Sequence, residues 1–185
     1  MDLENISLYV DDRPEDGVFR VHPDVYADPK LFELEQSLVF ERTWNFFGLE
    51  SQVPKPHDFI TAYIGRLPVL VTRDANGRLG AFLNVCRHKG NLMTRVESGH
   101  RKFHTCQYHG WVYDSAGRIV DIKDRAAAGY TAAFEADSHD LVPIARLESY
   151  KGLLFGSMSA DVPALADFLG DLRFFLDAAM EQGPH

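Results

Sequence analysis

Two short segments near the middle of the chain each pair a cysteine with a histidine, and they constrain the fold more than any other feature. The first is Cys86-Arg87-His88 and the second is Cys106-Gln107-Tyr108-His109, with residues 89–105 between them. Thiolates and imidazoles are ligands for transition metals. The intervening residues are about as long as a β-hairpin, so the spacing predicts two ligand-bearing loops that meet at one end of a β structure.

This ligand set is typical of a Rieske [2Fe–2S] centre, in which a cysteine pair binds one iron and a histidine pair the other. Two thiolates and two neutral imidazoles leave the oxidised cluster without net charge, whereas four thiolates would leave it negative. A neutral site accepts an electron more readily, so the mixed set raises the reduction potential. The motif therefore predicts one-electron transfer rather than acid–base or nucleophilic chemistry.

Zinc is the main alternative, because it also takes two cysteines and two histidines in structural sites. Zinc fingers usually place Cys beside Cys and His beside His in sequence, whereas each segment here supplies one of each. A disulfide between Cys86 and Cys106 would leave His88 and His109 without a role. The sequence favours the iron–sulfur cluster and leaves a structural zinc module open.

Composition sets limits on the class of protein. The chain has 185 residues, is 45% hydrophobic and carries a net charge of −8, which suggests one domain with helical extensions and argues against nucleic-acid binding. The charge is compatible with attraction to a basic partner. Both cysteines belong to the motif, which predicts a cytoplasmic protein. No signal peptide or membrane span is expected.

Helical patterns flank a β-rich middle. Residues 1–27 lack strong periodicity, and Asp28-Pro29 predicts a helix start with the helix continuing to about Arg42. Asn76-Gly77 predicts a hairpin in which both turn positions take positive φ, and Lys151-Gly152 predicts a second hairpin. Residues 123–140 are predicted to form a long loop. Apolar residues then recur at helical spacing from Leu165, with a stop at Gly183-Pro184.

These patterns predict a mainly β fold, a Rieske [2Fe–2S] domain of stacked antiparallel sheets with flanking N- and C-terminal helices. The expected division is an N-terminal arm and helix over 1–43, the iron–sulfur domain over 44–160 and a C-terminal helix over 161–185. The cluster-binding lobe is expected at about 85–123. Gly90 and Gly110 lie beside the ligands, where the backbone must approach the cluster closely.

The chain resembles the N-terminal part of the large (α) subunit of aromatic ring-hydroxylating dioxygenases, especially the benzoate, toluate and anthranilate group. The resemblance runs from about residue 18 to the end. It rests on four stretches, which are AFLNVC at 81–86, CQYHGW at 106–111, SHDL at 138–141 and ESYKGLLFGS at 148–157.

The resemblance implies that Cys86 and Cys106 bind one iron and that His88 and His109 bind the other. Trp111 would lie against the cluster loops. The family commonly has Arg-Gly-Ala after the first histidine, whereas this chain has Lys89-Gly90-Asn91. Lysine keeps the positive charge but lacks the planar fork of arginine, so contacts of that arginine do not carry over.

The resemblance also implies a function. Such subunits receive electrons from an NADH-dependent reductase and pass them to a mononuclear Fe(II), held by two histidines and a carboxylate in a C-terminal catalytic domain. The reaction would be cis-dihydroxylation of an aromatic carboxylate, with neighbouring α subunits and a small β subunit as partners. The chain ends where that domain would begin, so it is expected to be inactive alone. A stand-alone Rieske ferredoxin is the competing function.

The remaining histidines offer one candidate for a second metal site. Glu97, His100 and His104 have a suitable spacing, but they lie between the ligand loops, where an enclosed substrate cavity is not expected. The other histidines are predicted to be ordinary surface or hydrogen-bonding residues, namely His22, His57, His139 and His185.

Overall fold

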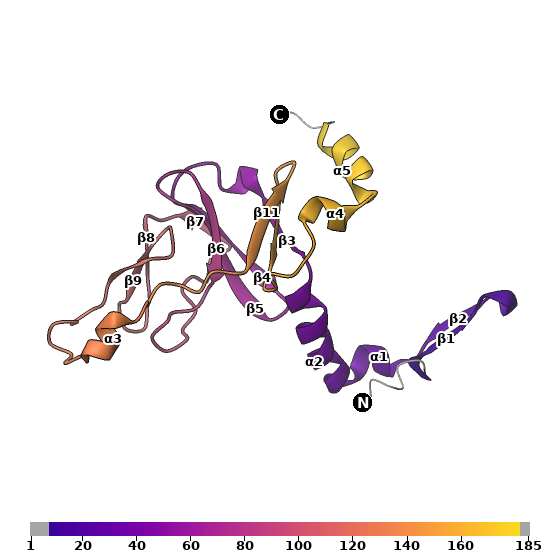
Figure 1. Cartoon of the computed structure of the whole chain (residues 1–185), viewed down its shortest axis with the longest axis horizontal. Coiled ribbons are helices and arrows are strands. Elements are labelled where there is room, and N and C mark those ends of the chain that lie inside the picture. The colour runs from indigo at the N-terminus through magenta and orange to yellow at the C-terminus, as the bar shows by residue number, and fades with distance from the viewer. Residues whose placement is uncertain (1–7, 182–185) are drawn as a thin grey trace.

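The computed structural model describes residues 8–181, and its centre is a pair of antiparallel sheets (Figure 1). One sheet has the strand order β6-β5-β4-β7 and the other the order β11-β12-β3. The strands of the first are β4 (Asp58–Ile64), β5 (Leu67–Arg73), β6 (Leu79–Leu83) and β7 (Ser98–His100). Those of the second are β3 (Asn45–Leu49), β11 (Arg146–Tyr150) and β12 (Leu153–Ser157).

A shared apolar core joins these two sheets. One face of each sheet carries apolar side chains that pack against the other sheet, and strand β5 is buried on its opposite face as well. The core contains Phe47, Val53, Ile60, Ile64, Val69, Val71, Ala81, Ile144 and Leu154. The mainly β fold of stacked antiparallel sheets with flanking helices, predicted from the sequence, is confirmed.

A third sheet carries the two Cys/His segments. Its order is β10-β9-β8, with β8 (Phe103–Thr105), β9 (Val112–Asp114) and β10 (Ile119–Asp121). We call residues 85–123 the ligand lobe, which lies at one end of the molecule (Figure 1). The lobe packs on the first central sheet through a second core, made of Phe59, Leu70, Cys86, Met93, Cys106, Trp111, Tyr113, Ile122 and Leu141. The two cysteines are thus built into a packed interior.

In two hairpin loops an aspartate side chain accepts backbone N–H groups, an arrangement that the sequence pattern did not predict. The hairpin predicted at Asn76-Gly77 forms between β5 and β6, but only Gly77 takes positive φ (80°), so the expectation of positive φ at both turn positions is wrong. Instead, the Asp74 carboxylate accepts backbone N–H groups from Asn76 and Arg78. Asp114 accepts the corresponding N–H groups in the β9–β10 loop. An aspartate can replace a turn hydrogen bond in this way, which favours a longer loop.

The β11–β12 hairpin agrees with its prediction. Lys151 and Gly152 both take positive φ, 50° and 82°, as a two-residue turn between twisted strands requires. The strands on either side pair in register from Tyr150 with Leu153 to Arg146 with Ser157. This hairpin completes the second central sheet.

The N-terminal arm contains more structure than the sequence suggested. Helix α2 (Pro29–Leu38) begins at Asp28, whose side chain accepts the Lys30 N–H, as predicted. The α-helix ends at Leu38, and a 3₁₀ turn covers 40–42, where a continuous helix was expected. Within residues 1–27, where the sequence shows no strong periodicity, the chain forms a hairpin of β1 (Val10–Arg13) and β2 (Val18–Val21), followed by α1 (Asp24–Ala27). These short, mostly exposed elements have no clear hydrophobic period.

The C-terminal segment is two helices instead of the predicted one. Helix α4 (Leu165–Leu169) and helix α5 (Leu172–Glu181) are separated at Gly170, which takes φ 49°. Leu165 and Leu169 are buried with Trp44, whereas Phe174 on α5 is 74% exposed. The helical spacing of apolar residues continues across Gly170, so the sequence pattern did not reveal the break. The positive φ of Gly170 ends α4. The predicted stop at Gly183-Pro184 and residue His185 lie outside the described residues.

Residues 123–140, predicted as a loop, contain helix α3 (Ala132–Ala136). The Thr131 side chain caps it by accepting the Phe134 N–H. A helix of this length is too short to produce a recognisable apolar period. The segment folds back beside the ligand lobe (Figure 1).

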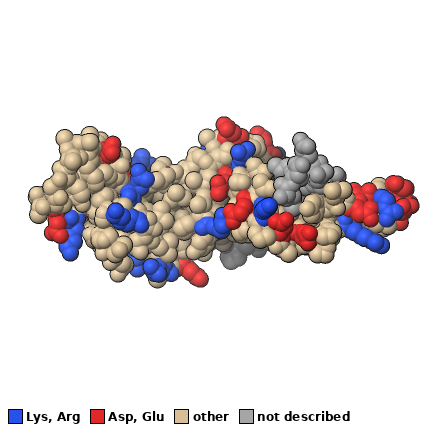
Figure 2. All heavy atoms as spheres, turned by 90° about the horizontal axis from the view of Figure 1, so that it is seen from below, with Lys and Arg blue, Asp and Glu red and all other residues tan. Residues whose placement is uncertain are grey.

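Charge is distributed unevenly over the chain. Residues 85–123 contain seven Lys or Arg and three Asp or Glu, although the whole chain carries −8. Lys and Arg accordingly outnumber Asp and Glu on the left of Figure 2, the end that carries the ligand lobe. The predicted attraction to a basic partner, drawn from the overall charge, therefore does not apply to this lobe. Across residues 8–181, no helix combines the length and apolarity that crossing a membrane requires.

We predict that Gly156→Ala destabilises the central core by about 1–3 kcal/mol, because overpacking a filled core is unfavourable. A Cβ atom at Gly156 would overlap the buried ring of Phe47 and crowd Ile144. Urea denaturation would measure the unfolding free energy. Combining Gly156→Ala with Phe47→Leu should cost less than the sum of the single changes. Strict additivity in that cycle would contradict this packing.

Candidate metal centre

The first ligand loop is closed by two backbone hydrogen bonds. It follows β6 directly, and the Cys86 N–H donates to the Asn91 carbonyl at 2.8 Å. The Gly90 N–H donates back to the Cys86 carbonyl at 2.9 Å, and Gly90 takes φ 70°. Glycine adopts this left-handed conformation without steric cost, so the chain can reverse within a few residues of Cys86. His88 lies at the tip of the reversal.

The second ligand loop repeats the same closure between β8 and β9. The Cys106 N–H donates to the Trp111 carbonyl at 2.8 Å, and the Gly110 N–H donates to the Cys106 carbonyl at 3.0 Å. Gly110 takes φ 71°. In both loops the glycine comes four residues after the cysteine, although the histidine comes two residues after Cys86 and three after Cys106. The two loops therefore hold their ligands on equivalent backbone turns.

The four side chains separate into an inner sulfur pair and an outer imidazole pair. Cys86 and Cys106 are 3% and 2% exposed, lie in one core and form no disulfide. His88 is half-buried and His109 is exposed, and their Nδ1 atoms lie 3.1 Å apart. Two ring nitrogens this close together can both bind one metal ion, since metal–nitrogen bonds are about 2.0–2.1 Å long in zinc sites, for comparison.

The surroundings of the site favour the thiolate form of Cys106 and the neutral form of the His88 imidazole. Burial opposes ionisation of Cys106, but N–H groups of Tyr108 and His109 outweigh it and lower the pKa of that thiol. Burial raises the pKa of the Cys86 thiol. Burial, with charge from His109 and Lys89, lowers the pKa of His88. Neutral imidazole is the form that binds a metal.

Tyr113 is a member of the site that the sequence analysis did not identify. Its side chain is fully buried, and its hydroxyl lies 3.5 Å from Cys86 Sγ and accepts the Arg87 N–H at 3.1 Å. Burial raises the pKa of Tyr113, so the hydroxyl keeps its proton. Alternation along β9 could have found it, because Trp111 and Tyr113 point to the same face.

Three residues proposed to accompany the ligands lie around the loops. Trp111 is buried, and its ring stacks on His88 at 4.9 Å between centroids with an interplanar angle of 11°. Lys89 is exposed beside His88. A Cβ atom added at Gly110 would lie 3.2 Å from the Lys123 stem, which covers the second loop.

The alternative site at Glu97, His100 and His104 is not formed. His100 makes a 2.8 Å contact between its Nδ1 and Asp58 Oδ1. His104 is 1% exposed and packs on Phe59, and neither of its ring nitrogens has a hydrogen-bond partner among the described residues. Within residues 8–181 no three His, Cys, Asp or Glu side chains converge on one ion.

The arrangement of the four ligands distinguishes a zinc site from an iron–sulfur cluster. A structural zinc site needs four ligands around one ion, whereas a Rieske cluster needs two around each of two irons. Inner sulfurs and outer nitrogens in separate pairs fit the second arrangement. The donor set and its geometry therefore suit a [2Fe–2S] cluster.

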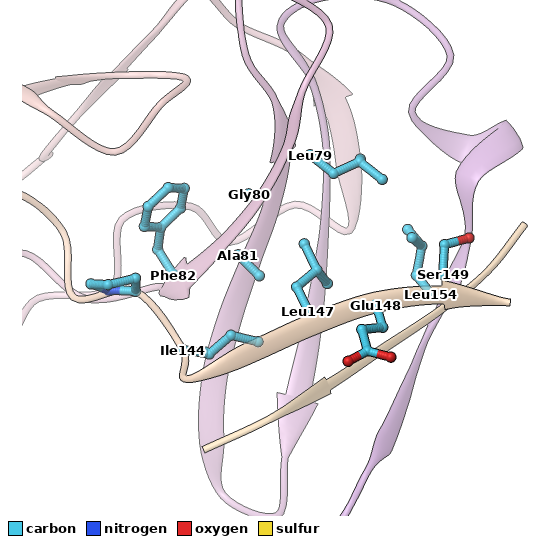
Figure 3. A pocket seen from close by; sticks show the side chains of 10 residues that line it. Leu79, Gly80, Ala81, Phe82, Ile144, Leu147, Glu148, Ser149 and Leu154 are labelled. Atoms are coloured by element: carbon cyan, nitrogen blue, oxygen red, sulfur yellow. The ribbon is translucent and has the colours of Figure 1, made fainter. Parts of the chain in front are cut away.

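Three of the four remaining histidines make hydrogen bonds, as predicted, and the exposed His22 accepts the Asp24 N–H at 3.2 Å through its Nδ1. His57 Nδ1 lies 2.8 Å from Ser115 Oγ, and His139 Nε2 lies 2.8 Å from the Phe134 carbonyl oxygen. A hollow of about 250 Å³ between β6 and β11 contains one charged side chain, Glu148 (Figure 3). Glu148 already bonds Arg146 and the Leu165 N–H, so the one carboxylate among the lining residues is engaged in structural contacts.

Comparison with known proteins agrees with the site. Residues 43–150 match the Rieske [2Fe-2S] domain, so the chain belongs to the Rieske [2Fe–2S] domain family. It is 40% identical to the toluate 1,2-dioxygenase α subunit of Pseudomonas putida, over 98% of this chain and 40% of that protein. It is 42% identical to the anthranilate 1,2-dioxygenase large subunit of Acinetobacter baylyi, over 95% of this chain and 37% of that protein.

A solved structure shows the same fold. Naphthalene 1,2-dioxygenase from Rhodococcus sp., bound to indole, superposes with a TM-score of 0.72 at 34% identity. The match covers 84% of this chain and 38% of that one. The chain thus spans about two fifths of the length of its relatives, and they are α subunits of aromatic ring-hydroxylating dioxygenases, as the sequence resemblance implied.

We predict that His104 makes the fold acid-sensitive. Burial, with charge from Arg101, lowers the pKa of His104 to about 4 from its ordinary 6.5. The unfolded chain therefore binds the proton first, and the stability present above pH 6.5 is lost as pH falls toward 4. The full loss would be about 3 kcal/mol.

The His104→Phe variant lacks this titration and is the matched control. Urea denaturation at several pH values should show wild type losing stability relative to the variant between pH 6.5 and 4. Below about pH 4 the difference should stop growing. Parallel pH profiles for the two proteins would contradict the assignment.

Proposed function

We propose that Cys86 and Cys106 bind one iron of a Rieske [2Fe–2S] cluster and that His88 and His109 bind the other. The observation that carries this proposal is the separation of buried sulfurs from facing imidazoles. Bound there, the cluster supplies storage and transfer of one electron. Lys89, Gly90, Gly110 and Trp111 form its protein surroundings.

The residues of the chain would shape that electron transfer. The two closed loops fix the ligand positions, and the apolar core keeps water from the sulfurs. Tyr113 donates its hydroxyl proton toward Cys86 Sγ, which favours added negative charge on the sulfur side. The exposed face of His109 gives the electron a short route to a partner.

The larger function we propose is electron supply within an aromatic ring-hydroxylating dioxygenase. An NADH-dependent reductase would deliver electrons to this domain, which would pass them to a mononuclear iron in a catalytic domain. The names of the toluate and anthranilate enzymes support an aromatic carboxylate as the substrate for cis-dihydroxylation. Neighbouring α subunits and a small β subunit would be the assembly partners.

Two observations bear on the partner and the compartment. The ligand lobe carries an excess of Lys and Arg, which supports an approaching surface rich in carboxylates. Both cysteines are reserved for the cluster, which supports the cytoplasm as the compartment.

The competing stand-alone ferredoxin is less well supported. A small carrier needs neither α2 nor the pair α4 and α5, which lie outside the two main cores. Phe174 and Phe175 on α5 are largely exposed, an arrangement that favours burial in a larger assembly.

Iron analysis with EPR of the dithionite-reduced protein tests the cofactor. We expect two irons per chain and the EPR signal of a reduced Rieske cluster. Zinc would give neither colour nor signal. Cys86→Ser should abolish the cluster, whereas Ser149→Ala on the exposed side of β11 should retain it. An iron-free, colourless wild type after anaerobic reconstitution would refute the proposal.

We predict that Tyr113→Phe lowers the reduction potential by tens of millivolts. The variant keeps the ring and loses only the hydroxyl that favours the reduced, more negative state, a hydrogen bond of about 1 kcal/mol. A redox titration followed by EPR would measure the shift. Tyr63→Phe, an exposed tyrosine on β4, is the control and should leave the potential unchanged. A rise in the potential of Tyr113→Phe would contradict the contact with Cys86.

His109→Cys tests the charge argument for the mixed ligand set. A third thiolate adds negative charge at the outer iron, so the potential should fall by roughly 100 mV or more, toward that of all-cysteine clusters. The measurement is a redox titration of variant protein in which iron analysis confirms an assembled cluster. An unchanged or higher potential would show that ligand charge does not set the potential.

A further inference from the structure

A set of four aromatic rings lies behind the first ligand loop, and we call it the aromatic buttress. Its members are Trp111, Tyr130, Phe134 and His139. Trp111 belongs to the ligand lobe, whereas the other three come from the segment 123–140 that the sequence predicted to be a loop. Two of these rings flank helix α3, and Phe134 lies within it.

Ring contacts run without a break from His88 to α3. Trp111 lies parallel to His88, with 4.9 Å between the ring centroids. Phe134 and His139 both meet Trp111 at steep angles, with centroids 6.1 and 5.5 Å away. Phe134 in turn stacks on His139 at 4.1 Å and on Tyr130 at 4.0 Å. Such pairs have preferred geometries and resist rotation of the rings.

The segment that supplies these rings is fastened by hydrogen bonds. His139 Nε2–H donates to the Phe134 carbonyl at 2.8 Å, which fixes the imidazole against α3. The Asp140 carboxylate accepts the Ile119 N–H at 2.7 Å, and the Leu141 N–H donates to the Gly117 carbonyl at 2.8 Å. The end of the segment is therefore tied to the β9–β10 hairpin, whose first strand begins one residue after Trp111.

The two imidazoles of the metal centre are supported differently. His109 stacks at 3.8 Å on Tyr108, its exposed neighbour in the chain. His88 instead rests on Trp111, which is 2% exposed and is held by residues far away in sequence. The plane of the His88 ring therefore depends on tertiary packing, whereas local structure supports His109.

We propose that Phe134 and His139 are positioning residues that hold Trp111 against His88 and so fix the plane of one iron-ligating imidazole. This inference rests on the proposed function, because it assigns His88 to the cluster. Both residues would act through Trp111, which their rings contact. Without their rings, Trp111 can tilt, and the His88 imidazole samples a wider range of orientations around its metal bond.

The test uses the full chain with its cluster assembled. Phe134→Ala removes the ring from the buttress, and Phe134→Tyr keeps it. His139→Gln removes a ring but retains an N–H donor for the Phe134 carbonyl. Phe103→Ala is the matched control, because Phe103 is half-exposed on β8 in the same lobe and is not part of the buttress.

Two measurements separate positioning from general stability. Pulsed EPR of the dithionite-reduced protein reports the nitrogen couplings of the two histidines, and loss of cluster absorbance in EDTA reports ligand release. We expect Phe134→Ala and His139→Gln to broaden the coupling of one histidine and to speed release roughly two- to tenfold. Phe134→Tyr and Phe103→Ala should match wild type in both measurements.

The outcomes distinguish this inference from the proposed function. A wild type without a Rieske EPR signal overturns the proposed function, and the inference falls with it. A normal wild-type signal with unchanged couplings in Phe134→Ala overturns the inference alone. If Phe134→Ala does not fold, His139→Gln decides between the same two results. Equal broadening in Phe103→Ala would also overturn it, since any loss of packing in the lobe would then suffice.

Discussion

The closure of the two ligand loops depends on the same pair of backbone hydrogen bonds in each. A cysteine N–H donates five residues forward, and the N–H of a glycine in positive φ donates back to that cysteine carbonyl. These bonds turn both sulfur atoms inward and leave both histidines at the rim. Because the closure uses only the backbone, the loops tolerate a different histidine offset after each cysteine. The two loops therefore differ in their side chains but share the same backbone hydrogen bonds.

The surroundings of the loops produce a steep change in polarity across a few ångströms. The sulfur side lies in an apolar core, where the hydroxyl of Tyr113 lies 3.5 Å from Cys86 Sγ. The imidazole side is open at His109 and lies in a lobe with an excess of positive charge. A low-dielectric interior strengthens each fixed dipole near the sulfurs. The exposed rim allows an electron to leave toward a partner without crossing the core.

Local patterns predicted the fold where they matched one dominant interaction. The cap at Asp28, the two-residue turn at Lys151-Gly152 and the Cys/His spacing were sufficient for α2, the closing hairpin and the ligand loops. They failed where a competing interaction prevailed. The carboxylate of Asp74 took over the turn at Asn76-Gly77, and Gly170 ended α4 inside a continuous apolar pattern.

The sequence by itself determined the ligand types, the glycines that let the loops close and the mainly β class, because each depends on residues close together in the chain. Only the tertiary structure placed Tyr113 beside Cys86 and brought Phe134 and His139 behind Trp111. Those contacts join segments far apart in the sequence, so no local pattern names both partners. These contacts form when the sheets and the 123–140 segment pack together, and that packing depends on residues from the whole chain.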